Sequence, residues 1–409
     1  MASNATRAVS APAHVLFVGA GAVGCFYASR LHHPAHDVRT SLTARSNYNA
    51  IASSGVSLKT RSFGDYTFLP DAVFPSVSAA APTTTTTSTS TSTATATSTS
   101  TATTTHDSPG RQSSEPRPAP PADGWDYVIV TTKALPDRTD DAAMIAPLVS
   151  PRTCIVLIQN GVGVEAPYRE RFPRNPIVSA VTIVSAEQVS QGVIRQNRWT
   201  RISLGPYTHG LGAGAGGASV AGVAASDGDG DGDGDGDGLA ARGHECMERL
   251  ARWWTELGGI RDVETHTELE LQTIRWHKLC INAAFNSTAV LSGGRGNADQ
   301  LTDPELRAHI AGVMAEIWDA APKVLGAPFP DTLATPERII RSNERNAGAK
   351  PSMLLDWEAG RPMELEVILG NPVRIARNAG AEMPRLQSMY ALLRSMQQTR
   401  EAARTKEKL

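Results

Sequence analysis

The chain has 409 residues, of which 41% are hydrophobic, and a formal net charge of −2 at pH 7. This length can bury a sizeable core and predicts two domains, whereas the near-neutral charge argues against nucleic-acid binding driven by general basicity. The four cysteines form no C-x-x-C pair, which fits a reducing compartment better than a disulfide-stabilised secreted protein.

The chain shows no strong targeting signal. No run of apolar residues approaches the roughly 18 needed to cross a bilayer, and residues 1–13 lack the apolar core of a secretory signal. The last residues match neither the ER-retention nor the peroxisomal tail. We therefore expect a cytoplasmic protein with no membrane or nucleic-acid partner, and the lone Arg7 leaves a mitochondrial location open.

The first predicted strand, His14–Val18, runs directly into a G-x-G-x-x-G motif that is followed by a helical pattern. A strand before and a helix after are the context that a dinucleotide-binding turn requires, and the helix N-terminus attracts the phosphates. The alternative is a glycine-rich turn without a ligand. The residues we expect to bind the cofactor here are Gly19, Ala20, Gly21, Ala22, Val23 and Gly24.

The second predicted strand, Asp37–Arg45, ends in a cation. A protein that binds NAD usually places an acidic residue there for the ribose 2′-hydroxyl, whereas an arginine suits a 2′-phosphate. Arg45 therefore favours NADPH over NADH, although it could equally be a solvated surface charge. Arg39 lies well before the carboxyl end of the strand, where the ligand is expected, and is the weaker candidate.

Two low-complexity tracts interrupt the globular pattern. The first runs from the Thr/Ser/Ala-rich residues 83–105 into a proline-rich stretch ending at Pro121, and the second, 210–238, ends in an Asp-Gly repeat. Neither can bury enough apolar surface to offset the entropy of ordering, so we expect disordered insertions over about residues 79–122 and 208–240. The repeat lacks the spacing of a calcium loop, so we expect no metal site.

Two further stretches, Trp125–Lys133 and Thr153–Gly163, are predicted to be buried parallel strands that end in polar or glycine residues. In an open α/β sheet the ligand lies beyond the carboxyl ends of the strands. Lys133 and Asn160 fall there and are candidate cofactor or substrate contacts, although ordinary loop residues would look the same. Strands and helices largely alternate up to about Val263, which predicts a Rossmann-type, doubly wound domain over residues 13–264.

The pattern from residue 265 onward is helical, and we expect an all-α domain over residues 265–409. One long predicted helix, His266–Leu291, carries a polar group at every fourth position of an apolar run: Lys278, Asn282 and Asn286. These groups share a stripe of the helix, and each would cost roughly 1–3 kcal/mol if buried without a partner. The partners are either other protein groups or a small polar substrate in the cleft between the domains.

A second polar cluster, Ser352–Glu366, precedes a predicted helix over Glu364–Asn378; two more helices are expected at Leu306–Leu325 and Pro336–Ala347. Glu364 and Glu366 open their helix, where carboxylates favour the helix dipole. Helix-start electrostatics alone could therefore explain both glutamates.

Taken together, the chain resembles the ketopantoate reductase (2-dehydropantoate 2-reductase) family. The resemblance rests on five motifs in this order: 19–24, Thr132-Lys133-Ala134, 159–163, 278–286, and Ser352-Met353 through 360–366. It covers nearly the whole chain apart from the two low-complexity tracts. Where the family often has Thr-Glu-Ile-Asp, this chain has Met363-Glu364-Leu365-Glu366, a departure that bears on the substrate.

The resemblance implies reduction of 2-dehydropantoate to pantoate by NADPH, a step of pantothenate biosynthesis. It implies that Lys278 is the general acid, that Glu364 is an active-site carboxylate, and that Asn282, Asn286 and Ser352 bind the substrate. Arg45, Lys133 and Asn160 match positions on the cofactor side. A carboxylate such as Glu364 would also keep the ammonium of Lys278 charged, because opposite charge counteracts desolvation.

Two other functions stay open at this point. The enzyme could reduce another branched 2-keto acid, or the chain could be a non-catalytic NADP(H)-binding regulatory protein that acts through its low-complexity tracts. The apolar helices of the second half could also support a homodimer.

Overall fold

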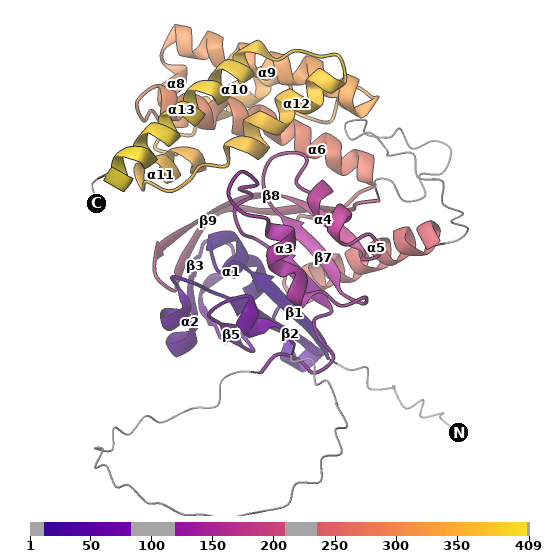
Figure 1. Cartoon of the computed structure of the whole chain (residues 1–409). Helices are drawn as coiled ribbons and strands as arrows, with labels where there is room; N and C mark the ends of the chain where they lie inside the picture. Colours follow the sequence, from indigo (N-terminus) through magenta and orange to yellow (C-terminus); the bar gives the residue numbers. More distant parts are fainter. Residues whose placement is uncertain (1–11, 83–118, 209–234, 407–409) are drawn as a thin grey trace, which may run out of the picture.

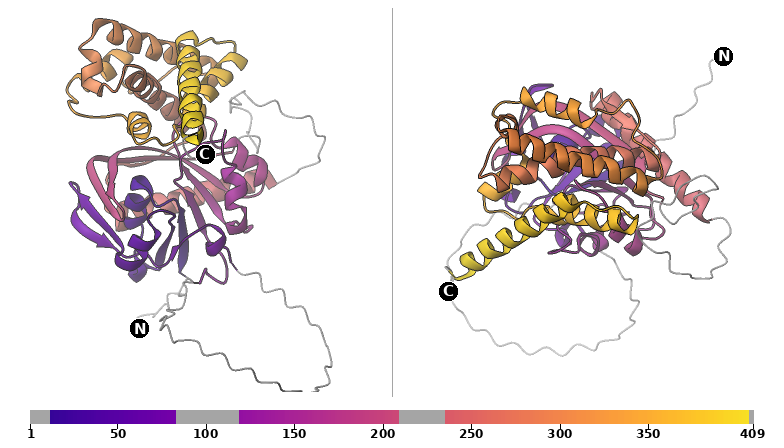
Figure 2. Two further views of the ribbon diagram at one scale, coloured as in Figure 1. Left: turned by 60° about the vertical axis from the view of Figure 1, so that its left-hand side comes forward. Right: turned by 90° about the horizontal axis from the view of Figure 1, so that it is seen from above.

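The computed structural model describes residues 12–82, 119–208 and 235–406. One sheet with flanking helices occupies residues 13–265, and a helical half lies against one edge of it (Figures 1 and 2). The expected fold class, a Rossmann-type α/β half followed by an all-α half, is confirmed. No helix among the described residues is long and apolar enough to span a membrane.

The described strands form one sheet in the order β4-β3-β9-β8-β7-β6-β1-β2-β5, with β10 beside β9. Strands β2, β1, β6, β7 and the first part of β8 run parallel, so their carboxyl ends meet at the edge that faces the helical half. The strands are β1 (Ala13–Val18), β2 (Val38–Thr43), β3 (Val56–Thr60), β4 (Gly64–Phe68), β5 (Val73–Phe74), β6 (Tyr127–Val130), β7 (Cys154–Ile158), β8 (Ile177–Ser190), β9 (Val193–Pro206) and β10 (Val263–Thr265).

The sheet is less purely parallel than the alternating pattern predicted. β8 and β9, 14 residues each, form a long antiparallel hairpin, and β3 pairs antiparallel with β4. Gly192 lies in the hairpin turn with φ +71°, a conformation that favours glycine. β8 pairs with β7 only over residues 177–180 and then continues beyond the parallel core, paired with β9.

Helices cover the sheet and carry its apolar contacts. In α1 the buried residues include Cys25, Phe26 and Tyr27, which pack in the same core as the strands. The elements of this half are α1 (Ala22–Ser29), α2 (Tyr48–Ser54), α3 (Asp141–Ile145), α4 (Ala166–Arg171), α5 (Asp235–Arg252), the 3-10 helices η1 (Pro34–His36), η2 (Ser78–Ala80) and η3 (Ala146–Leu148), and the π-helical turn η4 (Trp253–Leu257).

The structure describes the ends of both expected insertions, and the rest of each lies outside the described residues. The first was expected from about residue 79, but Ala80 is buried and its carbonyl accepts a hydrogen bond from Trp125 Nε1 at 2.9 Å. The second was expected to reach residue 240, but α5 begins at Asp235 and Leu239 is already buried. A helix packed on the sheet therefore begins within the acidic tract.

In the helical half, the long predicted helix divides into three connected parts: α6, a π-helical turn and α7. A capping box starts α6, since Thr267 Oγ1 accepts from Glu270 N at 3.3 Å and Glu270 Oε2 accepts from Thr267 N at 2.9 Å. The elements are α6 (Glu268–Ile281), η5 (Asn282–Asn286), α7 (Ser287–Leu291), α8 (Asn297–Leu301), α9 (Pro304–Leu325), α10 (Pro336–Glu344), α11 (Ser352–Glu358), η6 (Glu366–Gly370), α12 (Asn371–Asn378) and α13 (Pro384–Lys406).

Candidate active site

The glycine turn joins β1 to α1, and two of its three glycines lie in close contact with neighbouring atoms. Gly19 has φ +114°, and a Cβ on Gly24 would lie 2.2 Å from the Gly19 carbonyl oxygen. Gly21, the residue before α1, has nothing within 4 Å of the position of a Cβ. The turn is therefore closely packed at Gly19 and Gly24 and open at Gly21. Because Gly21 lies at a helix N-terminus, this open side fits a dinucleotide phosphate.

The end of β2 lies beside this turn. Gly19 N donates to Thr43 Oγ1 at 3.3 Å, and Arg45 follows two residues later with an exposed side chain. Asn47, which the sequence did not single out, is buried and donates from Nδ2 to the Ala20 carbonyl at 2.8 Å. The exposed Arg45 therefore follows closely on Thr43, the residue of β2 that contacts the glycine turn.

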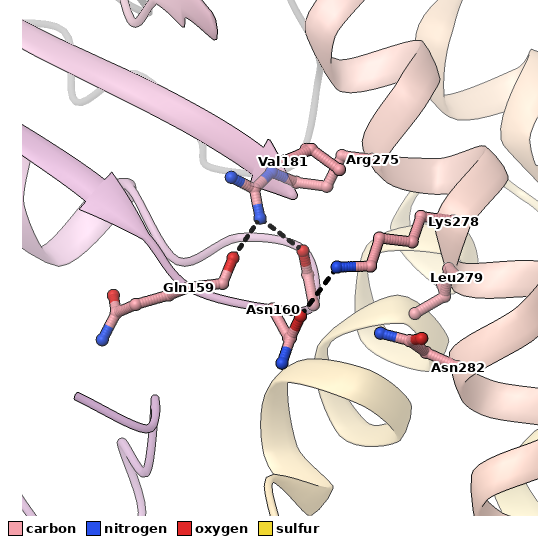
Figure 3. Close-up of a pocket in the computed structure, with 8 residues that line it drawn as sticks. Gln159, Asn160, Val181, Arg275, Lys278, Leu279 and Asn282 are labelled. Atoms are coloured by element: carbon pink, nitrogen blue, oxygen red, sulfur yellow. Dashed lines mark hydrogen bonds between the residues drawn. The ribbon is translucent and has the colours of Figure 1, made fainter. Parts of the chain in front are cut away.

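Asn160 lies between the two residues expected to carry the chemistry. Lys278 Nζ donates to Asn160 Oδ1 at 2.9 Å, and Asn160 Nδ2 donates to Glu364 Oε2 at 3.2 Å. Figure 3 shows Lys278 extending from α6 toward the turn after β7, with Asn282 on the same side of the pocket. A cation, an amide and a carboxylate from three separate segments therefore meet at the carboxyl edge of the sheet.

Burial changes the acid strength of this set. Desolvation, and next the positive charge of Arg275, lower the pKa of Lys278 to about 8, while the carboxylate of Glu364 opposes them. Burial raises the pKa of Glu364, against hydrogen bonds from Asn160 and from Ala134 N (3.1 Å). Glu364 acts on Lys278 in the expected direction, but desolvation outweighs it.

The other two polar residues of the helical stripe have different surroundings. Asn282 lines the pocket with Lys278 and Asn160, and Asn286 Nδ2 donates to Ser352 Oγ at 3.5 Å. An i→i+5 turn winds through fewer degrees per residue than an α-helix, so η5 keeps Asn282 and Asn286 closer to one line than an α-helix would. Glu364 lies just before η6 and accepts hydrogen bonds from Ala134 N and Asn160 Nδ2, so helix-start electrostatics do not account for it alone.

The ammonium of Lys133, a residue expected to contact the cofactor, is already paired with a carboxylate of the protein. This ammonium forms an ion pair with the buried Asp356 of α11, which also pairs with Arg361 at 3.1 Å. Lys133 thus links the end of β6 to the helical half, next to Ala134, whose N–H donates to Glu364. Asp356 was not among the predicted site residues, although it lies within the polar cluster that the sequence identified.

Arg275 and Glu165 were also missed. Arg275 lines the pocket one helical turn before Lys278 and pairs with Glu165, and both side chains are only 2% exposed. The spacing of three residues from Lys278 was a signal for Arg275, whereas no local pattern singles out Glu165. Among the residues that the structure describes, no group of three or more His, Cys, Asp or Glu could hold a metal ion.

Comparison with known families decides the assignment. The model of ketopantoate reductase PanE/ApbA matches residues 15–209, and that of the PanE/ApbA C-terminal domain matches residues 270–397. The chain belongs to the ketopantoate reductase family. The resemblance that the motifs indicated is confirmed, and at the level of the family the chain is an NADP-dependent oxidoreductase.

Individual members of the ketopantoate reductase family are distant in sequence. An uncharacterised protein of Saccharomyces cerevisiae is 24% identical over 93% of this chain and 92% of its own, and the 2-dehydropantoate 2-reductase of Nostoc sp. is 23% identical over 66% and 73%. The crystal structure of 2-dehydropantoate 2-reductase from Methylococcus capsulatus is 28% identical and covers 95% of this chain and 97% of its own, with a TM-score of 0.67.

Proposed function

We propose that this protein reduces 2-dehydropantoate to pantoate with NADPH, the reaction that serves pantothenate biosynthesis. The observation that carries the proposal is the Asn160 side chain, which joins the ammonium of Lys278 to the carboxylate of Glu364 at the edge of the sheet where the glycine turn opens. Named relatives such as the Nostoc enzyme support the choice of substrate.

The proposed division of labour follows the two halves. The dinucleotide-binding domain, residues 13–264, would hold the pyrophosphate over Gly21 and the 2′-phosphate at Arg45, with Lys133 and Asn160 nearer the nicotinamide. The catalytic domain, residues 265–409, contributes Lys278 and Glu364. The end of β10 at Thr265 and the start of α6 at Glu268 support this boundary.

When bound, the reduced nicotinamide supplies a hydride to the keto carbon, and negative charge then develops on the carbonyl oxygen. Lys278 is suited to stabilise that charge and to donate a proton to that oxygen, because a general acid works best with a pKa near the operating pH and that of Lys278 is lowered to about 8. Asn160 orients the ammonium by accepting its hydrogen bond at 2.9 Å.

Substrate binding is assigned to the amides that follow Lys278 along the helix. Asn282 and Asn286 offer donors and acceptors to the hydroxyl and carboxylate oxygens, and Ser352 Oγ, next to Asn286 Nδ2, adds a donor for the carboxylate. Glu364, held by Asn160 and Ala134 N, keeps the polar side of the pocket in place.

Nicotinamide oxidation, followed optically with a panel of 2-keto acids and with both NADPH and NADH, tests the proposal. We expect 2-dehydropantoate with NADPH to give the highest kcat/KM. Faster reduction of another branched 2-keto acid would reassign the substrate, and NADPH binding without turnover of any keto acid would leave a cofactor-binding regulatory protein.

A further inference from the structure

Arg275 and Glu165 form a buried ion pair that connects the two halves of the molecule. Arg275 Nε lies 3.2 Å from Glu165 Oε1, which also accepts hydrogen bonds from Ser179 Oγ at 2.6 Å and Gln272 Nε2 at 3.0 Å. Glu165 precedes α4 in the sheet half, whereas Arg275 lies on α6. Burial opposes ionisation of the carboxyl, but the guanidinium and these hydrogen bonds hold the pKa of Glu165 below its usual value.

The guanidinium also forms hydrogen bonds with the turn that carries Asn160. Arg275 Nη1 donates to the carbonyl oxygens of Gln159 and Gly161, at 2.8 and 2.9 Å, the residues on either side of Asn160 (Figure 3). Its Nη2 donates to Ser179 Oγ at 2.6 Å and to the carbonyl of Ala180 at 3.2 Å. A planar group with several fixed donors can do this where a lysine cannot.

Arg275 therefore holds the turn on which Asn160 lies, and Asn160 in turn accepts the hydrogen bond from Lys278. The approach is close from the other side as well: a Cβ on Gly161 would lie 2.3 Å from the Val367 carbonyl oxygen. The turn is therefore held on one side by the guanidinium and on the other by close packing against Val367.

Arg275 acts on Lys278 by charge as well. The charged or titratable groups around the Lys278 ammonium are Arg275 on its own helix and Glu364 across the pocket, with Lys133 and Asp356 acting on Glu364. Asn160, in the turn after β7, and Val181, in β8, add no charge. Of these groups Arg275 is the one whose charge favours release of the Lys278 proton.

We propose that the Arg275–Glu165 pair is a positioning device for catalysis: it fixes the Asn160 turn against Lys278 and places a permanent positive charge one helical turn from the proton donor. Glu165 keeps the guanidinium oriented and gives this buried charge an anionic partner. The inference rests on the proposed reduction for its kinetic consequence, but its effect on Lys278 exists with or without turnover.

The test replaces the pair by neutral groups of similar size, Arg275→Gln/Glu165→Gln, so that no buried charge is left unpaired. Ionisation of Lys278 is followed by NMR of protein with 13C-labelled lysine. The chain has seven lysines, so the Lys278 signal is identified by its loss in Lys278→Met. We expect a midpoint near pH 8 in the unaltered protein and a higher midpoint in the double variant.

Arg275→Lys separates positioning from charge. It retains the positive charge but cannot reach both carbonyl oxygens, so we expect kcat to fall about tenfold or more while the Lys278 midpoint stays below that of the double variant. The matched control is Arg385→Gln/Glu316→Gln, which removes the ion pair at 3.2 Å between α13 and α9. This control should leave both the midpoint and kcat unchanged.

An unchanged midpoint in the folded double variant, or an unchanged kcat in Arg275→Lys, overturns the inference. If the double variant does not fold, Arg275→Lys alone decides. A midpoint that shifts as expected in a protein that reduces no 2-keto acid would reject the proposed reduction and leave the electrostatic role of Arg275 standing.

Discussion

At the scale of single residues, the acid strength of Lys278 depends on groups that are distant in the sequence. Its ordinary pKa of 10.5 is lowered to about 8, first by desolvation and then by Arg275, with Glu364 opposing. Without burial, an exposed lysine would be a weak acid at neutral pH and would donate its proton slowly. Burial in the pocket therefore makes this amine a stronger acid at neutral pH.

The direct test of this residue is Lys278→Ala. Removal of the proton donor should reduce kcat by about two orders of magnitude or more, a usual contribution of general acid catalysis. NADPH affinity, measured by fluorescence titration, should change little, because the glycine turn is separate from α6. Lys323→Ala, on the surface of α9, is the control, and full activity of the Lys278 variant would remove the residue from its assigned role.

The lowered pKa of Lys278 also predicts a pH profile. Reduction needs the protonated amine, so kcat/KM should be constant below pH 8 and fall about tenfold per pH unit above it, since the pKa of Lys278 is about 8. Oxidation of the 2-hydroxy acid needs the neutral amine and should show the opposite trend. A reduction plateau that extends to pH 10 would show that Lys278 keeps its ordinary pKa.

We propose that Arg45 favours NADPH over NADH by binding the 2′-phosphate. Loss of a charge-assisted contact costs roughly 1.5–3 kcal/mol, about tenfold or more in affinity. Arg45→Ala should therefore raise the Kd of NADPH by that factor and leave the Kd of NADH unchanged, as measured by calorimetry. Arg39→Ala, which breaks an exposed pair with Asp71, is the control; equal losses for both cofactors would contradict a 2′-phosphate site.

At the scale of elements, the β1–α1 turn and the α6–η5–α7 helix place the site, and the sequence identified both. The G-x-G-x-x-G spacing is a local pattern whose geometry follows from the glycines themselves. The polar stripe on the helix could also be recognised in the sequence, because Lys278, Asn282 and Asn286 are spaced four residues apart. The π-helical turn was not, since it depends on the packing of α6 and η5 against α9 and of α6 against the sheet.

Gly21→Ala tests the open side of the glycine turn. Gly21 has φ −85° and nothing within 4 Å of the position of a Cβ, so alanine should leave the Tm of the free protein nearly unchanged. The methyl group would occupy the space proposed for the pyrophosphate, and dinucleotide affinity should fall at least about tenfold. Gly243→Ala in α5 is the control; unaltered binding by the Gly21 variant would move the phosphate elsewhere.

At the scale of the whole molecule, the ends of the first low-complexity tract return to the same place. A Cβ on Gly124 would lie 3.8 Å from Pro82 Cγ, and Trp125 Nε1 donates to the Ala80 carbonyl at 2.9 Å. The cost of closing a loop grows slowly with its length, about 0.6 kcal/mol per doubling. The folded core therefore depends little on what connects these two points.

Replacing residues 83–118 by a short Gly-Ser linker should accordingly leave the fold intact. We expect a Tm within a few degrees of the full chain, since a shorter loop changes the closure entropy by only about 1–2 kcal/mol, and unchanged kcat with the best keto acid. Differential scanning calorimetry and the nicotinamide assay measure both. A loss of activity at unchanged Tm would show that the tract takes part in function.

The sequence by itself determined the elements whose signals are local. The glycine turn at residues 19–24, the strands that end near Lys133 and Asn160, and the stripe of Lys278, Asn282 and Asn286 could be predicted, because steric limits and helical periodicity act over a few residues. The order of these motifs was also sufficient to indicate the family. The sequence did not give the distances between these motifs in the folded protein.

The tertiary structure alone decided which groups meet. Asn160 lies between Lys278 and Glu364, Lys133 pairs with Asp356, and Glu165 pairs with Arg275, although each contact joins segments far apart in the chain. The lowered pKa of Lys278 follows from that burial and from no residue pattern. Contacts of this kind arise from the packing of one domain on the other, which fixes desolvation and charge together.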